Sequence, residues 1–155
     1  EVVLIGTPGD VPLRLAKARD LGFTQLIDIG QTDPVKAVLE WTDGLGADVV
    51  VECSGAPKAI PVTVDLVRKM GKIGVIGLTG RRKVELDWDK LLFKVVTMHF
   101  HLSTAYTFWD RTIHLIASGQ LPAERLITHR AGLDDWEQVF DDIENLKALK
   151  AVLMP

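Results

Sequence analysis

Residues 46–57 read G-A-D-V-V-V-E-C-S-G-A-P, and this stretch decides the fold class. Its run of Val49, Val50 and Val51 lacks the alternation of polar and apolar residues that a half-exposed strand shows. We therefore expect a strand covered on both faces, as in parallel sheets that lie between layers of helices. The turn that follows, S-G-A-P, lies where such sheets bind ligands, at the carboxyl end of a strand. A plain connection between a strand and a helix is the alternative interpretation of this turn.

The composition indicates a globular protein and excludes several partners. The chain has 155 residues, of which 47% are hydrophobic, so it can bury a core, and its length suits one domain. The net charge is −3, and no basic stretch is interleaved with aromatic residues, so we expect no nucleic-acid partner. No apolar run approaches the roughly 20 residues of a membrane span, so we expect no membrane partner.

Cysteine content and the first residues point to a cytoplasmic protein. Cys53 is the single cysteine, which excludes an intrachain disulfide and a zinc site made of four thiolates. The sequence begins directly in a strand pattern, without a charged and then apolar leader. A cytoplasmic location is therefore expected.

Strands and helices are expected to alternate along the chain. Strands are predicted where short apolar runs end at turn-forming residues, and helices where apolar residues recur at helical spacing. The expected strands are residues 2–5, 25–29, 47–53, 72–78, 95–102 and 149–154, with a short extended piece at 84–86. The expected helices are residues 12–21, a helix capped by Asp33, a helix that Gly71 ends, a helix from Asp87 through Lys94, and residues 106–118 and 134–145. This order predicts an α/β fold with a mostly parallel sheet.

Three residues inside these strands need a specific neighbour. Gly74 and Gly77 lie within the predicted strand 72–78, where glycine is unfavourable unless a backbone or a ligand comes close. Glu52 is an acid on an otherwise apolar strand, so it needs a polar partner when buried.

Five motifs, taken in order, resemble the medium-chain, zinc-dependent alcohol dehydrogenase superfamily. They are G-A-D-V-V-V-E-C-S-G-A-P at 46–57, G-K-I-G-V-I-G-L at 71–78, L-I-A-S-G-Q-L at 115–121, L-I-T-H-R at 126–130 and A-L-K-A-V-L at 148–153. They are similar to the nucleotide-binding and C-terminal portion of that family, and most similar to its polyol and threonine dehydrogenase branch. The resemblance implies a Rossmann-like, doubly wound sheet. It also implies that Glu52 faces a domain outside this chain.

The resemblance also implies two absences. In the family, a G-x-G-x-x-G turn follows the first strand and holds the cofactor pyrophosphate, but here Gly6 and Gly9 follow what aligns as the second strand. The N-terminal domain that supplies the catalytic zinc ligands is missing as well. We therefore expect residues 1–155 to be a truncated NAD(P)-binding domain with the C-terminal segment, without catalytic or metal-binding residues. A sheet in the order 3-2-1-4-5-6 that lacks strand 1 must close the gap, borrow a strand or leave edges exposed.

The same resemblance assigns residues to the nicotinamide half of the cofactor. Cys53, Ser54 and Gly55 align with the segment whose backbone flanks the nicotinamide ribose. Ile76, Gly77 and Leu78 align with the segment that touches the nicotinamide itself. His101 and Leu102 align close to the nicotinamide, and Lys150 aligns with a basic residue that reaches the pyrophosphate. Ordinary strand ends and a surface lysine are the alternative interpretations.

The adenosine half is less defined. Gly6 and Thr7 lie at the end of the second family strand, where an Asp or Glu binds the ribose in NAD enzymes, and that acid is absent. Arg14 aligns with a basic residue near the ribose and favours a 2′-phosphate. Either NAD or NADP therefore fits as the cofactor. The alternative interpretations are that Thr7 only shapes a loop and that Arg14 lies on a solvated helix face.

The predicted strand 95–102 carries two further expectations. His99 and His101 point to the same side, but no carboxylate or thiol at suitable spacing completes a metal site with them. The resemblance makes this strand a sheet edge that pairs with its counterpart in a homodimer. Phe100 stands where the family has a glycine, which weakens the expectation of close backbone approach there.

Two functions follow from the sequence. The first is the cofactor-binding portion of an oxidoreductase that moves a hydride between a secondary alcohol, such as a polyol or amino alcohol, and NAD or NADP. Zinc then belongs only to the missing domain, and we expect residues 1–155 alone to be inactive. The second is a non-catalytic, truncated Rossmann module that acts in oligomerisation or partner binding through its edge strand. A methyltransferase is a more distant alternative, and the motifs argue against it.

Overall fold

Strands and helices alternate throughout the computed structural model, which describes all 155 residues. The residues divide into two compact units, the first made of Glu1–Thr32 and Thr104–Pro155 and the second of Asp33–Ser103. The strands form three separate sheets, of two, three and two strands, and every strand pair is parallel. The predicted α/β fold with parallel sheets is confirmed, and the organisation as one truncated domain stays a prediction.

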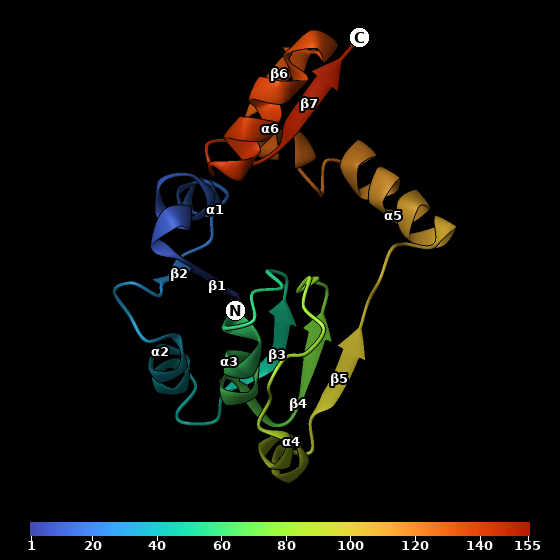
Figure 1. The fold of residues 1–155 in the computed structure, drawn as a ribbon. Helices are drawn as coiled ribbons and strands as arrows, with labels where there is room; N and C mark the ends of the chain where they lie inside the picture. Colours follow the sequence, from blue (N-terminus) through green and yellow to red (C-terminus); the bar gives the residue numbers. More distant parts are fainter. The chain divides into compact units, whose positions relative to one another are not determined.

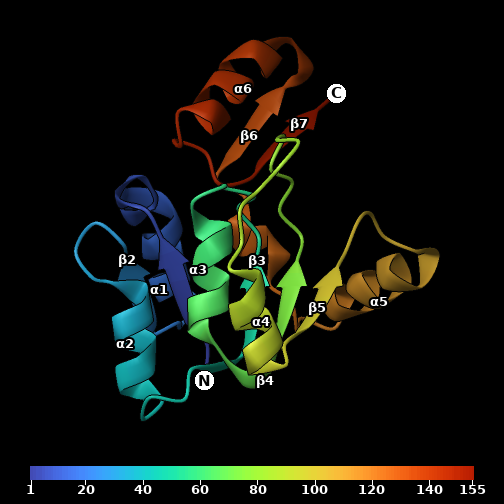
Figure 2. The same cartoon turned by 60° about the horizontal axis from the view of Figure 1, so that its bottom comes forward.

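The second unit contains a three-stranded sheet with β4 at its centre. The strands are β3 (Ala47–Glu52), β4 (Val67–Val75) and β5 (Thr97–Phe100). Their connections are α3 (Ala59–Leu66) and α4 (Trp88–Lys94), and the three strands run side by side in Figure 1. Figure 2 shows both helices on the same side of the sheet.

Local hydrogen bonds define where two helices of this unit begin. The Asp33 carboxylate accepts hydrogen bonds from the backbone N–H groups of Val35 and Lys36, at 2.8 and 3.2 Å, at the start of α2 (Pro34–Trp41). The Asp87 carboxylate accepts one from the N–H of Lys90, at 3.0 Å, at the start of α4. Both acids satisfy donors that a first helical turn leaves free, so these two predicted helix starts are confirmed.

The expectation that β3 is buried on both faces is wrong. Glu52 is 4% exposed and Ile73, on the neighbouring strand, is fully buried, because α3 and α4 cover this face. Val49 and Val51 point to the opposite face and are 57% and 55% exposed. The valine run is uniformly apolar, yet the two helices that connect the strands of this sheet, α3 and α4, lie on one side of it (Figure 2).

The boundary between α3 and β4 also differs from the prediction. The helix ends at Leu66 instead of continuing to Gly71, because Val67 is extended, fully buried and paired with Ala47 of β3. The register shifts between Ala47 and Val49, and Met70 adopts a positive φ of 58° in this irregular stretch. Pairing with a distant strand therefore decides this boundary.

Two further segments are shorter than expected. Residues 84–86 form no strand, and β5 begins at Thr97 instead of residue 95. Val95 takes a left-handed φ of 53° at the end of α4, which excludes it from the strand.

Lysines of α4 hold the carboxyl end of α3. The Lys94 ammonium donates hydrogen bonds to the carbonyl oxygens of Val64, Asp65 and Val67, at 2.7, 3.1 and 2.6 Å. Lys90 forms an ion pair with the Asp65 carboxylate. Burial and then the charge of Lys90 lower the pKa of Lys94, although Asp65 opposes this shift. These contacts satisfy carbonyls that the last turn of a helix leaves free.

The first unit begins with a parallel strand pair and a helical connection. β1 (Val3–Gly6) pairs with β2 (Gln25–Asp28). Between them lie a 3-10 turn (Pro8–Asp10), a π-helical turn (Val11–Leu15) and α1 (Ala16–Asp20). The expected strands and helix are confirmed, although the helical segment starts four residues earlier than predicted, at Pro8 instead of residue 12.

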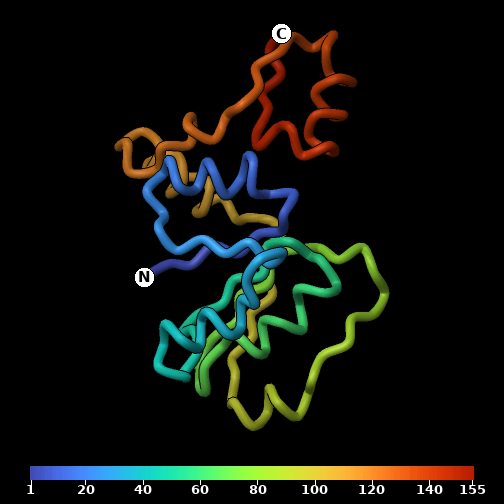
Figure 3. The backbone as a smooth tube through the Cα atoms, turned by 90° about the vertical axis from the view of Figure 1, so that its left-hand side faces the viewer, coloured from blue at the N-terminus to red at the C-terminus, as the bar shows by residue number.

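The remainder of this unit contains two long helices and a second strand pair. After α5 (Tyr106–Ala117), β6 (His129–Gly132) and β7 (Ala151–Met154) pair in parallel, with α6 (Trp136–Glu144) between them. The tube in Figure 3 shows β6 and β7 side by side and α6 as their connection. The helices and the last strand are confirmed, whereas β6 is too short and too polar to have been predicted. No helix combines the length and the apolar character needed to cross a membrane.

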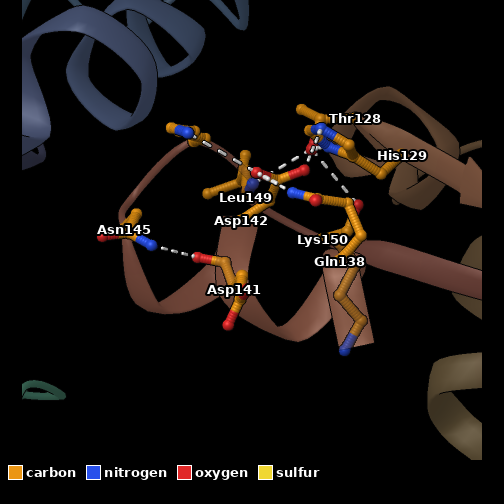
Figure 4. Close-up of polar contacts among 9 residues, drawn as sticks. Thr128, His129, Gln138, Asp141, Asp142, Asn145, Leu149 and Lys150 are labelled. Carbon is orange, nitrogen blue, oxygen red and sulfur yellow. Dashed lines mark hydrogen bonds and ion pairs between the residues drawn. The ribbon is translucent and has the colours of Figure 1, made fainter. Parts of the chain in front are cut away.

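A polar network fixes this last strand pair (Figure 4). The Thr128 hydroxyl accepts a hydrogen bond from the N–H of Leu149 at 3.0 Å, and the Thr128 N–H donates to the Lys150 carbonyl oxygen at 2.9 Å. His129 Nδ1 lies 2.9 Å from the same hydroxyl, and its Nε2 lies 4.0 Å from the Asp142 carboxylate. His129 therefore has a structural role.

We predict that Lys94→Met lowers the free energy of unfolding by about 1–3 kcal/mol, because it leaves carbonyl groups of α3 without their donor. Urea denaturation followed by circular dichroism measures this change. Lys69→Met is the matched control, since Lys69 is exposed and its side chain makes no hydrogen bond or ion pair. Equal destabilisation by the two substitutions would contradict the prediction.

Candidate functional site

Two turns meet where β3 and β4 end. The carbonyl oxygen of Glu52, the last residue of β3, accepts hydrogen bonds from the N–H groups of Ile76 and Gly77, at 2.8 and 3.1 Å. The pairing of the two strands thus continues past the end of β4. Ligands of parallel sheets bind at this edge, where the chain leaves the strands.

The two turns touch through their backbones. A side-chain carbon on Gly55 would lie 2.2 Å from the carbonyl oxygen of Leu78, and one on Gly77 would lie 2.1 Å from the nitrogen of Gly55. Gly55 also has a φ of 64°, which other residues adopt only with strain. The expected close approach of another backbone is confirmed at Gly77, whereas at Gly74 no part of the chain comes within 4 Å of an added carbon.

The Glu52 carboxylate lies beneath the first turn and determines its shape. One oxygen accepts hydrogen bonds from the N–H groups of Ser54 and Gly55, at 2.9 and 3.0 Å, and from the Ser54 hydroxyl. That hydroxyl in turn accepts a hydrogen bond from the N–H of Ala56 at 3.1 Å. The expectation that the partner of Glu52 lies in another domain is wrong, because residues two and three positions further along the chain satisfy the buried acid.

The Cys53 thiol is exposed beside this acid. Partial burial and, second, the charge of Glu52 raise the pKa of the Cys53 thiol. A raised pKa keeps the thiol protonated near neutral pH, which is the opposite of what a nucleophilic cysteine requires. The turn therefore presents a neutral thiol at its surface.

The structure brings together the eight site residues predicted in this unit at one edge of the sheet. The side chains of Ile76 and Leu78 are 55% and 79% exposed there. The N–H of His101 donates to the Val75 carbonyl oxygen at 2.9 Å, so the end of β5 lies next to the end of β4. Leu102, at 81% exposure, follows directly.

The two histidines of β5 and its extension form a pair. The rings of His99 and His101 are stacked, with centroids 6.3 Å apart and planes inclined by 29°. No cluster of three His, Cys, Asp or Glu side chains forms a metal site in the structure.

Three predicted site residues lie in the first unit, around Asp10. The N–H and hydroxyl of Thr7 donate to one Asp10 oxygen at 2.8 and 2.6 Å, and Arg14 Nη1 lies 3.4 Å from the other. Burial acts to raise the pKa of Asp10, but hydrogen bonds from Thr7 and the charge of Arg14 outweigh it, so the pKa is lowered. Gly6 packs against Asp10, since an added carbon would lie 3.1 Å from its Cβ.

Asp10 is not among the site residues predicted from the sequence. The signal that identifies it is the spacing T-x-x-D, in which a threonine and an acid three residues later bind each other's backbone at a helix start. This spacing places a carboxylate beside Arg14.

Lys150, expected near the cofactor pyrophosphate, lies just before β7. Its carbonyl oxygen accepts hydrogen bonds from the N–H groups of Thr128 and His129, whereas no contact reaches its ammonium group in Figure 4. The ammonium is thus free for a ligand, and its role there stays a prediction.

Comparison with known proteins assigns this chain to a family. The sequence model described as zinc-binding dehydrogenase matches residues 6–118. The chain belongs to the zinc-binding dehydrogenase family. It is 32% identical to sorbitol dehydrogenase of Halalkalibacterium halodurans over 154 residues, which cover 99% of this chain and 45% of that protein.

Two further relatives support the same assignment. The chain is 33% identical to L-threonine 3-dehydrogenase of Thermococcus kodakarensis, covering 99% of this chain and 44% of that protein. The solved structure of the alcohol dehydrogenase from Thermus sp. ATN1 matches with a TM-score of 0.91 and 26% identity, covering 100% of this chain and 44% of that chain. The resemblance and the Rossmann-like fold are confirmed, and the chain spans a little under half the length of these relatives.

We predict that Gly77→Ala destabilises the protein by about 3 kcal/mol or more, because its new methyl group would overlap the backbone of Gly55. Gly74→Ala, three residues earlier and within β4, is the control, and we expect it to be neutral or to stabilise by at most about 1 kcal/mol. Thermal and urea unfolding measure both. Similar effects of the two substitutions would refute the close packing of the turns.

We predict that alkylation of Cys53 by iodoacetamide requires a higher pH than alkylation of a free cysteine derivative, because the pKa of its thiol is raised. Glu52→Gln removes the nearby charge and should shift the rate profile to lower pH. The measurement is the alkylation rate as a function of pH. If the alkylation rate of the unaltered protein rises at the same pH as that of the free cysteine derivative, or at a lower pH, the raised pKa of the Cys53 thiol is contradicted.

Proposed function

We propose that this chain is the cofactor-binding portion of an NAD(P)-dependent oxidoreductase that transfers a hydride from a secondary alcohol. The observation that supports it is the contact between two glycine turns at the carboxyl edge of β3 and β4. This contact leaves backbone groups and the exposed side chains of Ile76 and Leu78 at the edge where parallel sheets bind nucleotides. An apolar surface of this kind suits the face of a nicotinamide ring.

The residues of the turns fit the nicotinamide half of a dinucleotide. Cys53, Ser54 and Gly55 would hold the ribose, because a buried acid fixes their turn and leaves Cys53 and Ser54 exposed, with Gly55 buried beneath them. Ile76, Gly77 and Leu78 would lie against the ring, with His101 and Leu102 beside it. When bound, the cofactor supplies the hydride acceptor, and this chain positions it.

We infer a preference for NAD over NADP. Arg14 is the cation that would pair with a 2′-phosphate, but it already lies beside the Asp10 carboxylate. The lowered pKa of Asp10 keeps this carboxylate charged, so it would repel a second anion at the same place. An acid near the adenosine ribose is also the typical arrangement in NAD enzymes.

The substrate belongs to the whole protein and is proposed from its relatives. Sorbitol dehydrogenase and L-threonine 3-dehydrogenase are named for a polyol and an amino alcohol, which support substrates of these classes. We propose that zinc, which polarises the alcohol, is held by a catalytic domain outside residues 1–155. A cytoplasmic location stays a prediction.

A role in assembly is the second candidate, favoured by the exposed edge of the three-stranded sheet. β5 pairs with β4 on one side only, so its other edge offers free backbone groups. Phe100 and Leu102 are 74% and 81% exposed on or next to it. A homodimer through residues 95–102 would cover them, and such pairing is compatible with cofactor binding.

We predict that isothermal titration calorimetry shows NAD binding, with a weaker affinity for NADP. Asp10→Asn removes the repelling charge and should narrow this difference, because Arg14 then meets the 2′-phosphate unopposed. Asp20→Asn, which removes the same charge from the exposed end of α1, should leave the ratio unchanged.

Tighter binding of NADP by the unaltered protein would refute the preference. Absence of binding by either cofactor, together with a stable dimer in sedimentation equilibrium, would refute the oxidoreductase proposal in favour of the assembly role.

A further inference from the structure

A cavity of about 530 Å³, open to solvent and lined by exposed residues, lies at the surface beside the turn between β3 and α3. It is lined by Ala56, Pro57, Lys58, Arg81 and Lys83. Three of these five residues are cationic, and the other two provide an apolar wall. The chain as a whole carries a net charge of −3, so the cations at this cavity are a local feature.

The three cations have no anionic partner within the protein. Lys58, Arg81 and Lys83 form no ion pair and donate no side-chain hydrogen bond, and all three are exposed. Elsewhere in the same unit, Arg68 and Lys90 pair with aspartates. Cations that line one cavity repel one another, and a bound anion relieves this repulsion.

Ordered segments on two sides hold these cations. The Thr79 hydroxyl accepts a hydrogen bond from the N–H of Arg81 at 3.0 Å and donates to its carbonyl oxygen at 3.3 Å, which fixes the turn that carries Arg81. On the other side, Lys58 directly precedes α3, whose first residue is Ala59. The amino end of this helix adds a partial positive charge to that of the lysine.

The place of the cavity connects it to the cofactor turns. Ala56 and Pro57 directly follow Ser54 and Gly55 in the chain, and Arg81 lies three residues after Leu78. A ligand that fills the cavity therefore lies next to the turns proposed to hold the nicotinamide and its ribose.

We infer that this cavity binds a phosphate group. A doubly charged phosphate matches several convergent cations, and the planar guanidinium of Arg81 can donate two parallel hydrogen bonds to it. The wall of Ala56 and Pro57 suits the carbon skeleton attached to the phosphate. The volume falls within the range of about 300–1,000 Å³ that small-molecule sites occupy. This inference rests on the proposed function and deepens it. If the phosphate belongs to the substrate, the substrate class is a phosphorylated polyol.

The test titrates the chain by calorimetry with inorganic phosphate, sorbitol 6-phosphate and sorbitol at low salt. We expect sorbitol 6-phosphate to bind at least about tenfold more tightly than sorbitol, since the phosphate adds charge-assisted hydrogen bonds. The double variant Arg81→Gln/Lys83→Gln should lose about tenfold or more in affinity for both phosphate probes. Higher salt should weaken the same binding.

The matched control is Lys69→Gln/Lys72→Gln. It removes the same charge from exposed positions of the same unit, away from the cavity, and should change the affinity by less than about twofold. Absence of binding by either phosphate probe, or equal losses in the two double variants, would overturn the inference.

Competition with NAD identifies the source of the phosphate. If sorbitol 6-phosphate and NAD bind together, the cavity takes the phosphate of the substrate, and if NAD displaces it, the cavity takes a phosphate of the cofactor. Both results support a phosphate site. A different result would refute the proposed function. That result is the absence of binding of both NAD and NADP to the unaltered chain, whether or not the phosphate probes bind.

Discussion

The backbone of Gly55 lies against the backbones of Gly77 and Leu78, with no space for a side-chain carbon between them. This contact brings the turn after β3 and the turn after β4 to one place, and the proposed cofactor surface depends on it. Any side chain at Gly55 or Gly77 would separate the two turns. Glycine at both positions is therefore a structural requirement of this sheet edge.

The buried Glu52 carboxylate makes this contact possible, because it accepts hydrogen bonds from the turn above it. The same charge acts on Cys53 and helps to raise the pKa of its thiol. One acid thus orders the turn and suppresses nucleophilic reactivity beside it. The turn is therefore ordered by the same acid that helps to keep its thiol unreactive.

Charge is distributed differently around the proposed ligand regions. Asp10 forms an ion pair with Arg14 near the end of β1, so this arginine is less able to bind a second anion. At the cavity beside α3, Lys58, Arg81 and Lys83 keep their charges unpaired. The first arrangement favours a ribose without a 2′-phosphate, and the second favours a phosphate group.

The sequence by itself determined those features that depend on neighbouring residues: the helix starts at Asp33 and Asp87, the alternation of strands and helices up to α5, and the glycine turn after β3. It also identified the two turns that we propose to bind the cofactor, because their motifs are local. Only the tertiary structure decided that Val67 leaves the helix to pair with Ala47, that β3 is open on one face, and that Lys58 and Arg81 share a cavity. These features depend on contacts between segments far apart in the chain, and such contacts leave no local pattern in the sequence.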